Sequence, residues 1–214
     1  MSGTSSNRIL SIYKARNTIL EFMDKLNYDI SEYNTFSINE IDAMFINNQL
    51  DMLLKHSTNQ QNVYIRYYFS DKTHTRQIRP QTLDTIIEDL YEIDNVLTKK
   101  DTLIIIIDEE PNDKIVQKMK YLYENNGIFV VIHNLKRLQY NLLNHALNPK
   151  VGILTEDAVE ALKKKMNIAT TKQLPEISRF DPLALAITLR PGQVASFERA
   201  SPTSLVQHYY RICV

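Results

Sequence analysis

The sequence predicts a two-part chain, with an α/β layer first and a smaller α+β domain after it. Strand-like runs at residues 62–70, 102–107 and 128–133 alternate with segments of helical periodicity. This strand–helix–strand–helix–strand order is typical of a sheet that is at least partly parallel. The middle run, TLIIII, is apolar on both faces, as a central buried strand requires.

A change in texture marks the boundary between the two parts. After residue 132 the sequence becomes polar and dotted with leucine until Pro149 closes the segment. We therefore predict an N-terminal domain over residues 1–140 and a C-terminal domain over residues 145–214.

The first part is expected to open with an amphipathic helix over residues 8–26, preceded by frayed residues 1–7. Apolar side chains recur there at helical spacing: Ile9, Tyr13, Ile19, Leu20, Met23 and Leu26. Ser37 with Glu40 three residues later is a capping box, which predicts the start of a second helix.

Two further helices are expected between the strands of the first part. Residues 81–93 have helical periodicity, and a helix after Pro111 is expected to end at the Asn-Asn-Gly of residues 125–127.

The second part contains clear helix and turn signals. Thr155 is expected to cap a helix that ends in the lysines of residues 163–165, where cations suit the helix dipole. Asp181 and Pro182 form an N-cap and first helical position, and Pro191-Gly192 fits a type II turn. Residues 194–199 and the chain end, with side chains alternating between two faces, are predicted strands.

Charge and composition limit the classes of function. The 25 Lys and Arg residues balance 25 Asp and Glu, whereas a dedicated nucleic-acid binder usually has a basic excess. Any DNA contact is therefore expected to be local. Cys213 is the one cysteine, which excludes an intrachain disulfide and favours a reducing compartment. Without a signal-peptide core or a membrane-length apolar run, we expect a soluble intracellular protein.

Signals for catalysis and metal binding are weak. The histidines are scattered along the chain: His56, His74, His133, His145 and His208. A zinc site needs closely spaced ligands, and the four glycines form neither a nucleophile elbow nor a phosphate loop. Cys213 is expected to be a buried structural thiol. We expect no catalytic residue, no metal ligand and no cofactor.

Two charged segments leave alternatives open. Asp108, Glu109 and Glu110 follow a buried strand, where magnesium-dependent nucleases place carboxylates, but the Glu-x-Lys or Asp-x-Lys partner occurs nowhere in the chain. A solvated loop is favoured over such a nuclease site. Three basic residues of one loop are candidate DNA-backbone contacts, although such loops are more often just solvated: Lys72, Arg76 and Arg79.

Several motifs of the second part occur in one order. The first is Asn141, His145, Leu147, Pro149 and Lys150. The following ones are Gln173, Leu174, Pro175 and Ile177; Asp181, Pro182 and Ala184; and Leu189, Gly192, Gln193, Val194 and Arg199. The last comprises Ser201, Thr203, Tyr210 and Arg211. In these motifs the chain resembles the jaw-and-assembly subunit of eukaryotic RNA polymerases, the fifth-largest common subunit, whose C-terminal domain matches a small subunit of archaeal RNA polymerase.

The first part is similar to the same family more weakly, through Arg16, Thr18 and Tyr28 and through the order of helices and strands. The resemblance implies a jaw domain that is a reduced endonuclease-like α/β layer without an active site. It also implies a small α+β assembly domain at residues 145–214.

The chain departs from the family pattern at several positions. Leu185 and Ala186 stand for Arg-Tyr, Arg190-Pro191 stands for Lys-Arg, and residues 201–206 replace Ser-Glu-Thr-Ala-Gly-Arg. In the last segment Pro202 replaces glutamate, Leu205 replaces glycine and Val206 replaces arginine. These losses are expected to alter contacts with the largest subunit, and they favour a polymerase outside the ordinary nuclear set, such as that of a large cytoplasmic DNA virus.

The resemblance implies a non-catalytic subunit of a multisubunit DNA-directed RNA polymerase. Its C-terminal domain is expected to dock on the largest subunit and its jaw to lie near downstream DNA, with no membrane contact and no homo-oligomer. The expected location is the nucleus for a cellular enzyme, and the host cytoplasm or virion for a viral one. The implied interface comprises His145, Pro149, Lys150, Leu174, Pro175, Asp181, Pro182, Gly192, Gln193, Val194, Tyr210 and Arg211. The alternatives are a magnesium-dependent nuclease-like enzyme using residues 108–110 and a free-standing transcription adaptor.

Overall fold

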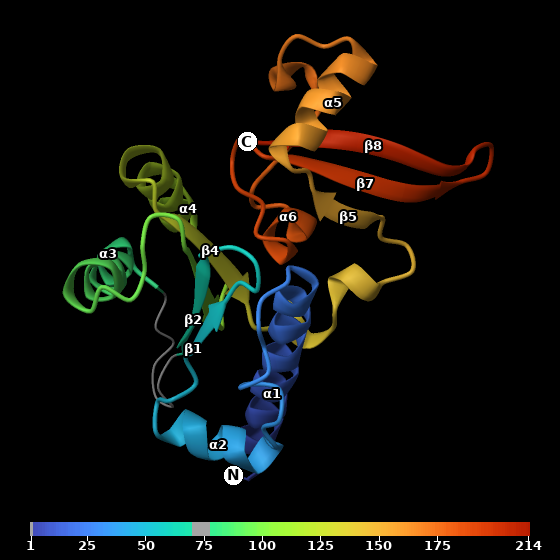
Figure 1. The fold of residues 1–214 in the computed structure, drawn as a ribbon. Coiled ribbons are helices and arrows are strands. Elements are labelled where there is room, and N and C mark those ends of the chain that lie inside the picture. Colours follow the sequence, from blue (N-terminus) through green and yellow to red (C-terminus); the bar gives the residue numbers. More distant parts are fainter. Residues whose placement is uncertain (1, 70–77) are drawn as a thin grey trace. The chain divides into compact units, whose positions relative to one another are not determined.

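The predicted parallel strands form the centre of the first sheet in the computed structural model, which describes residues 2–69 and 78–214 (Figure 1). The chain divides into unit 1, Met1–Tyr140, and unit 2, Asn141–Val214. Each unit contains one four-stranded sheet with its own helices, so the described chain is mixed α/β with two sheets.

The sheet of unit 1 has the order β1-β2-β3-β4. Its strands are β1 (Met52–Lys55), β2 (Asn62–Tyr68), β3 (Thr102–Ile107) and β4 (Phe129–Asn134). The β2–β3 and β3–β4 pairs are parallel, as predicted, whereas β1 is antiparallel to β2. Every residue of β3 and β4 is buried, which confirms the prediction from their apolar sequences. The short β1 was not predicted.

Helices connect the parallel strands of unit 1. The β2–β3 connection contains α3 (Pro80–Glu88) and a π turn at Asp89–Ile93, and the β3–β4 connection contains α4 (Asp113–Tyr121). A second π turn, Leu122–Asn126, ends at Gly127 in the left-handed conformation, so the predicted stop is confirmed. Figure 1 shows α3 and α4 on one side of the sheet and α1 on the other.

The first two helices of unit 1 are α1 (Ser2–Lys25) and α2 (Ile38–Ile46). Because α1 begins at Ser2, the expectation that residues 1–7 fray is wrong for the described part of that segment. The capping box at the start of α2 is confirmed. The Ser37 backbone N–H donates to Glu40 Oε2 at 2.7 Å, while Ser37 Oγ accepts from the Glu40 N–H at 3.4 Å.

The sheet of unit 2 has the order β5-β7-β8-β6. Its strands are β5 (Lys150–Ile153), β6 (Glu176–Ile177), β7 (Val194–Ser201) and β8 (Leu205–Cys213). The β5–β7 and β7–β8 pairs are antiparallel, and β6 lies parallel to β8. Short 3-10 turns at Arg137–Gln139, Leu142–Asn144 and Thr171–Gln173 complete the connections.

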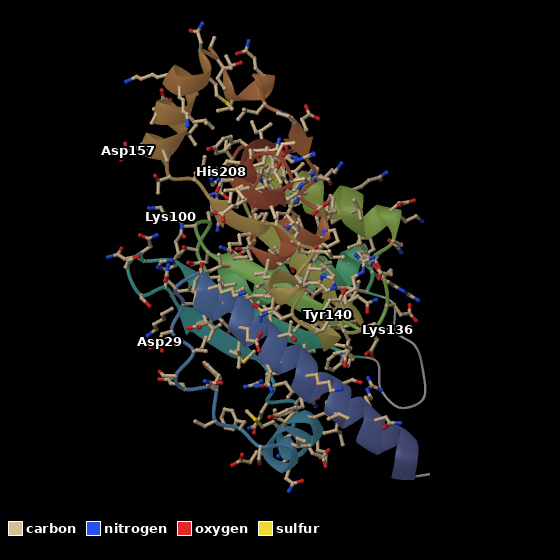
Figure 2. All side chains as sticks on the ribbon, turned by 90° about the vertical axis from the view of Figure 1, so that its right-hand side faces the viewer. Asp29, Lys100, Lys136, Tyr140, Asp157 and His208 are labelled. Carbon is tan, nitrogen blue, oxygen red and sulfur yellow. The ribbon has the colours of Figure 1, made fainter. Side chains whose placement is uncertain are left out.

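Unit 2 contains α5 (Glu156–Met166) and the short α6 (Pro182–Ala186). The predicted caps are confirmed: Thr155 Oγ1 accepts from the Ala158 N–H, and three lysines occupy the last turn of α5. In Figure 2 the side chain of Asp157 points outward from the first turn of α5. None of the helices among the described residues combines the length and apolar character needed to cross a membrane.

The cores of the two units differ in depth. In unit 1, β3 and β4 pack in an apolar interior with β1, β2 and α1, where many side chains have no exposed area. One core cluster of unit 2 comprises four buried side chains, Leu162, Leu174, Val194 and Ile212. Partly buried neighbours, Tyr210 among them, pack against this cluster.

Candidate assembly surface

The end of the chain is held from both sides in unit 2. On one side, the Gly192 N–H donates to Cys213 O and the Cys213 N–H donates to Gln193 O, both at 2.9 Å. On the other, the Ile212 N–H donates to Pro175 O, also at 2.9 Å. Three residues that the sequence singled out as interface candidates, Pro175, Gly192 and Gln193, therefore fix the backbone of β8.

The turn at residues 190–193 explains why glycine is needed there. Gly192 has φ +89°, a region that L side chains rarely adopt. The turn closes because the Gln193 N–H donates to Arg190 O at 3.0 Å, and Gln193 Oε1 accepts from the Arg190 N–H at 2.9 Å. These contacts confirm the predicted Pro-Gly turn.

Helix α6 begins at a cap of the predicted type. Asp181 Oδ1 accepts from the Leu183 N–H at 2.9 Å, and Pro182 occupies the first turn. A proline there has φ already set for a helix and no N–H that needs a partner. The Asp-Pro motif thus serves to shape the backbone, with Pro182 itself exposed.

The segment around His145 is shaped in the same way. Asn141 Oδ1 accepts from the Leu143 N–H at 2.8 Å, and the Asn148 side-chain amide donates to Leu142 O at 2.7 Å. His145 Nδ1 accepts from the Leu147 N–H at 3.3 Å. The polar motif residues therefore fold this loop locally, and they leave the Leu147 side chain 86% exposed.

The predicted interface residues fall into three classes of burial. The exposed ones are His145, Lys150, Pro175, Pro182 and Gly192. The half-buried ones are Pro149, Asp181, Gln193, Tyr210 and Arg211. Leu174 and Val194 are buried in the core of unit 2, so their side chains shape the surface from beneath and offer a partner no area of their own.

Three of these side chains also make contacts within unit 2. Lys150 Nζ lies 3.4 Å from Glu198 Oε1, and Arg211 Nη1 donates to Glu176 O at 2.9 Å. Tyr210 packs against the core cluster. Cys213, as predicted, is a buried thiol: its Sγ lies 3.6 Å from Leu189 O, and burial raises the pKa of the thiol to about 11.

The acidic strand end of unit 1 is occupied by ion pairs. Arg8 Nη2 lies 2.9 Å from Asp108 Oδ2, and Arg137 Nε lies 2.9 Å from Glu110 Oε1, which also accepts from the Asn134 amide. Asp108 and Glu109 are half-buried rather than fully solvated. Over residues 2–69 and 78–214, no group of three or more His, Cys, Asp or Glu side chains is placed to hold a metal ion. The arrangement ties the loop to α1 and to the 3-10 turn at Arg137–Gln139.

The residues that link unit 1 to the family are structural. Arg16 is 1% exposed, and its Nη1 donates to Leu50 O at 2.9 Å. Thr18 and Tyr28 are also buried. Of the candidate DNA contacts, Lys72 and Arg76 lie outside the described residues, whereas Arg79 is exposed at the N-cap position of α3.

Sequence reasoning did not select two large apolar side chains that unit 2 exposes. These are Leu147, at 86%, and Leu205, at 85%. Leu147 belongs to the His145 motif, and Leu205 is one of the departures from the family pattern, so each stood beside a signal already noted. The exposed strand residue His208 lies on the same hairpin as Leu205 (Figure 2).

A surface of proline corners, helix caps and a clamped strand end defines a protein-binding module, because its polar groups serve to fix its shape. Residues 140–213 match the family model of the RNA polymerase Rpb5, C-terminal domain. DNA-directed RNA polymerase subunit Rpo5 of Pyrococcus abyssi (strain GE5 / Orsay) is 40% identical over 76 residues, which are 36% of this chain and 92% of that protein.

Other relatives give the same picture. Rpo5 of Thermococcus kodakarensis is 40% identical over 76 residues, again 36% of this chain and 92% of that protein. Rpo5 of Archaeoglobus fulgidus is 34% identical over 77 residues, which are 36% of this chain and 100% of that protein. The chain belongs to the Rpb5/Rpo5 family of DNA-directed RNA polymerase subunits.

Proposed function

We propose that the chain is a non-catalytic subunit of a multisubunit DNA-directed RNA polymerase and takes part in DNA-templated transcription. The observation that carries this proposal is the identity of unit 2 with archaeal Rpo5 over nearly the whole length of those proteins. The local structure agrees with it, since the shared motifs form caps, turns and strand clamps, which a docking module needs.

Docking is assigned to unit 2 and to the largest polymerase subunit. The exposed members of the predicted interface are His145, Lys150, Pro175, Pro182 and Gly192. Proline fixes its own backbone angle, so a surface cornered by prolines loses little conformational entropy when it is bound. The buried Leu174 and Val194 contribute by holding that surface in shape.

Unit 1 is assigned the role of a jaw beside the downstream duplex. Its α/β sheet with helices on both sides is compatible with the reduced endonuclease-like layer that the family resemblance implies. The carboxylates at its strand end are engaged by Arg8 and Arg137, which suits a structural role for that edge. Arg79 is exposed and is the described candidate for a phosphate contact.

Co-purification tests the subunit assignment. The full chain, tagged at its own gene, is purified from the cells that make it, and the co-eluting chains are identified by mass spectrometry. We expect the large polymerase subunits in near-stoichiometric amounts. Recovery of the chain without them contradicts the proposal and favours a free-standing adaptor.

A surface variant tests the docking assignment. Pro182→Glu changes an exposed position but keeps a residue that is favourable in the first turn of a helix, so α6 is expected to form. We expect this variant, combined with His145→Glu, to recover less of the largest subunit at unchanged thermal stability. The control is Lys172→Glu, an exposed position of unit 2 outside the predicted set. Equal recovery by all proteins places docking elsewhere.

Salt dependence tests the DNA contact. In the assembled polymerase, Lys72, Arg76 and Arg79 are replaced together by alanine. Each lost phosphate contact reduces the slope of log affinity against log salt by about 0.9, so three contacts reduce it by about 3. The control replaces Lys163, Lys164 and Lys165. An unchanged slope in the loop variant contradicts the contact.

The nuclease hypothesis is tested separately. The isolated chain is incubated with duplex DNA and Mg²⁺, beside an Asp108→Ala variant. We expect no cleavage by either protein. Cleavage that disappears in the variant contradicts a purely structural role. The cellular location is expected to follow the polymerase, either the nucleus or, for a viral enzyme, the host cytoplasm or virion, and imaging of the tagged chain tests it.

A further inference from the structure

The β7–β8 hairpin of unit 2 ends in a ribbon that no third strand supports among the described residues. β5 pairs with β7 only from Ala195 to Glu198, and β6 pairs with β8 only at Ile212 and Cys213. The rest of the hairpin therefore has two strands, and Figure 1 shows it extending away from α5 and α6. An isolated two-stranded ribbon is marginal in water.

The base of this ribbon is nevertheless ordered by an aromatic pair. Phe197 and Tyr209 face each other across the strands, with ring centroids 4.9 Å apart and planes 7° from parallel. Phe197 is buried, so this pair connects the ribbon to the body of unit 2. The stacked rings give the tip a defined direction.

Leu205, at the tip, is in an unfavourable conformation. Its φ is +60°, the left-handed region in which a side chain with a Cβ is strained and glycine is relaxed. Its side chain is also 85% exposed, so packing within this chain does not offset the strain. The next residue, Val206, is 44% exposed. Strain of this kind that the fold does not use is a reason to look for a role in binding.

The chemistry of the tip selects the kind of partner. Residues 201–207, Ser-Pro-Thr-Ser-Leu-Val-Gln, carry no charged side chain. Binding to nucleic-acid phosphates depends on lysine and arginine, so this tip does not suit DNA or RNA. A projecting leucine and valine on small polar neighbours suit an apolar pocket on another protein, where large buried side chains act as anchors.

We propose that Leu205 is an anchor that inserts into an apolar pocket on another protein subunit of the polymerase. The proposal rests on the proposed function, because it takes the partner from the same assembly. Binding then buries the leucine and supplies the support that the two-stranded ribbon lacks.

Substitutions at position 205 separate binding from folding. Leu205→Gly removes the side chain and relieves the backbone strain, so we expect the full-length chain to have an unchanged or higher Tm. We expect its Kd for polymerase depleted of this chain to rise by about tenfold or more, the size of effect for exposing a buried leucine. Leu205→Asn, which tolerates the left-handed conformation but is polar, is expected to bind as weakly as the glycine variant. Leu205→Met, which stays apolar, is expected to bind nearly as well as the parent.

Three results overturn the proposal. Binding by Leu205→Gly as tight as that of the parent shows that the side chain is not an anchor. A lower Tm for the free glycine variant shows that Leu205 serves folding. Failure of the parent chain itself to bind the depleted polymerase overturns the proposed function, and with it this inference.

Photocrosslinking identifies the partner directly. A benzophenone amino acid is placed at position 205 of the chain in the assembled polymerase, and at the exposed Lys172 as the control. We expect the probe at 205 to crosslink to another polymerase subunit, with little of that product from position 172. Crosslinks from 205 to DNA, to lipid or to a second copy of this chain contradict the proposal.

Discussion

Unit 1 buries every residue of β3 and β4, whereas β8, the longest described strand of unit 2, is buried only at Ile212 and Cys213. The two regions therefore depend on different forces. Unit 1 is held by apolar area removed from water, which is the larger source of folding free energy. Unit 2 has a shallower cluster and relies more on caps, a tight turn and hydrogen bonds that clamp the end of the chain.

This difference explains where the recognisable motifs lie. Many apolar side chains of similar size can fill a buried strand, so its sequence carries little that is specific. A positive φ, a helix cap or a proline corner accepts few residue types. The Asp-Pro and Pro-Gly motifs of unit 2 are of this second kind, and residues 140–213 are also the part that matches the family model.

A cavity in β3 is expected to give the largest loss of stability. Ile105 has no exposed area, so Ile105→Ala should reduce the unfolding free energy of unit 1 by about 2 to 5 kcal/mol. Urea denaturation followed by circular dichroism measures it, with Ile93→Ala, at a 70% exposed position, as the control. A loss below about 1 kcal/mol would mean that unit 1 does not depend on core burial as described.

Acid is expected to destabilise unit 1 through His133. Burial, the larger cause, and the nearby Arg137 cation lower the pKa of His133 from 6.5 to about 4. Between these pH values the unfolded chain binds a proton that the folded chain does not. The unfolding free energy should therefore fall by up to about 3 kcal/mol as the pH decreases from about 6.5 to about 4.

The variant His133→Gln removes the titrating ring and should flatten that part of the pH profile. His208→Gln, at an exposed position of unit 2, is the matched control. Denaturation at several pH values makes the comparison, and an unchanged slope in His133→Gln would assign the acid sensitivity to other groups.

In unit 2, the turn glycine is expected to matter more than an ordinary surface glycine. Gly192→Ala forces a side chain into φ +89° and should cost about 1 to 2 kcal/mol, although the added methyl has open space around it. Gly152→Ala is the control, because its φ is ordinary and its added methyl meets only Ser196 Oγ at 3.7 Å. Equal thermal shifts for the two variants would remove backbone strain as the cause.

The cap of α6 is expected to give the smallest effect. Asp181→Ala removes the acceptor for the Leu183 N–H and should cost about 1 kcal/mol, measured as a shift in the thermal unfolding of unit 2. Asp181→Asn keeps a side-chain oxygen in the same place and should retain most of the stability. If the asparagine variant is as unstable as the alanine variant, the contribution is one of charge rather than of capping.

Elements with local signals could be predicted from the sequence. TLIIII has no polar face, so it had to be an interior strand. Ser37, Thr155, Asp181 and Gly192 meet needs of the backbone within a few residues of themselves, and the structure confirms each of them. The strand β1 was missed because its four residues gain their identity by pairing with β2.

The sequence by itself determined the mixed α/β class, the capped helices, the Pro-Gly turn and the family, because these depend on contacts between near neighbours and on motifs in order. Only the tertiary structure decided that Leu174 and Val194 lie inside, that Arg8 pairs with Asp108 one hundred residues away, and that Leu205 projects in a strained conformation. The physical reason is that burial and pairing depend on which distant segments meet. A side chain's own chemistry does not encode that information.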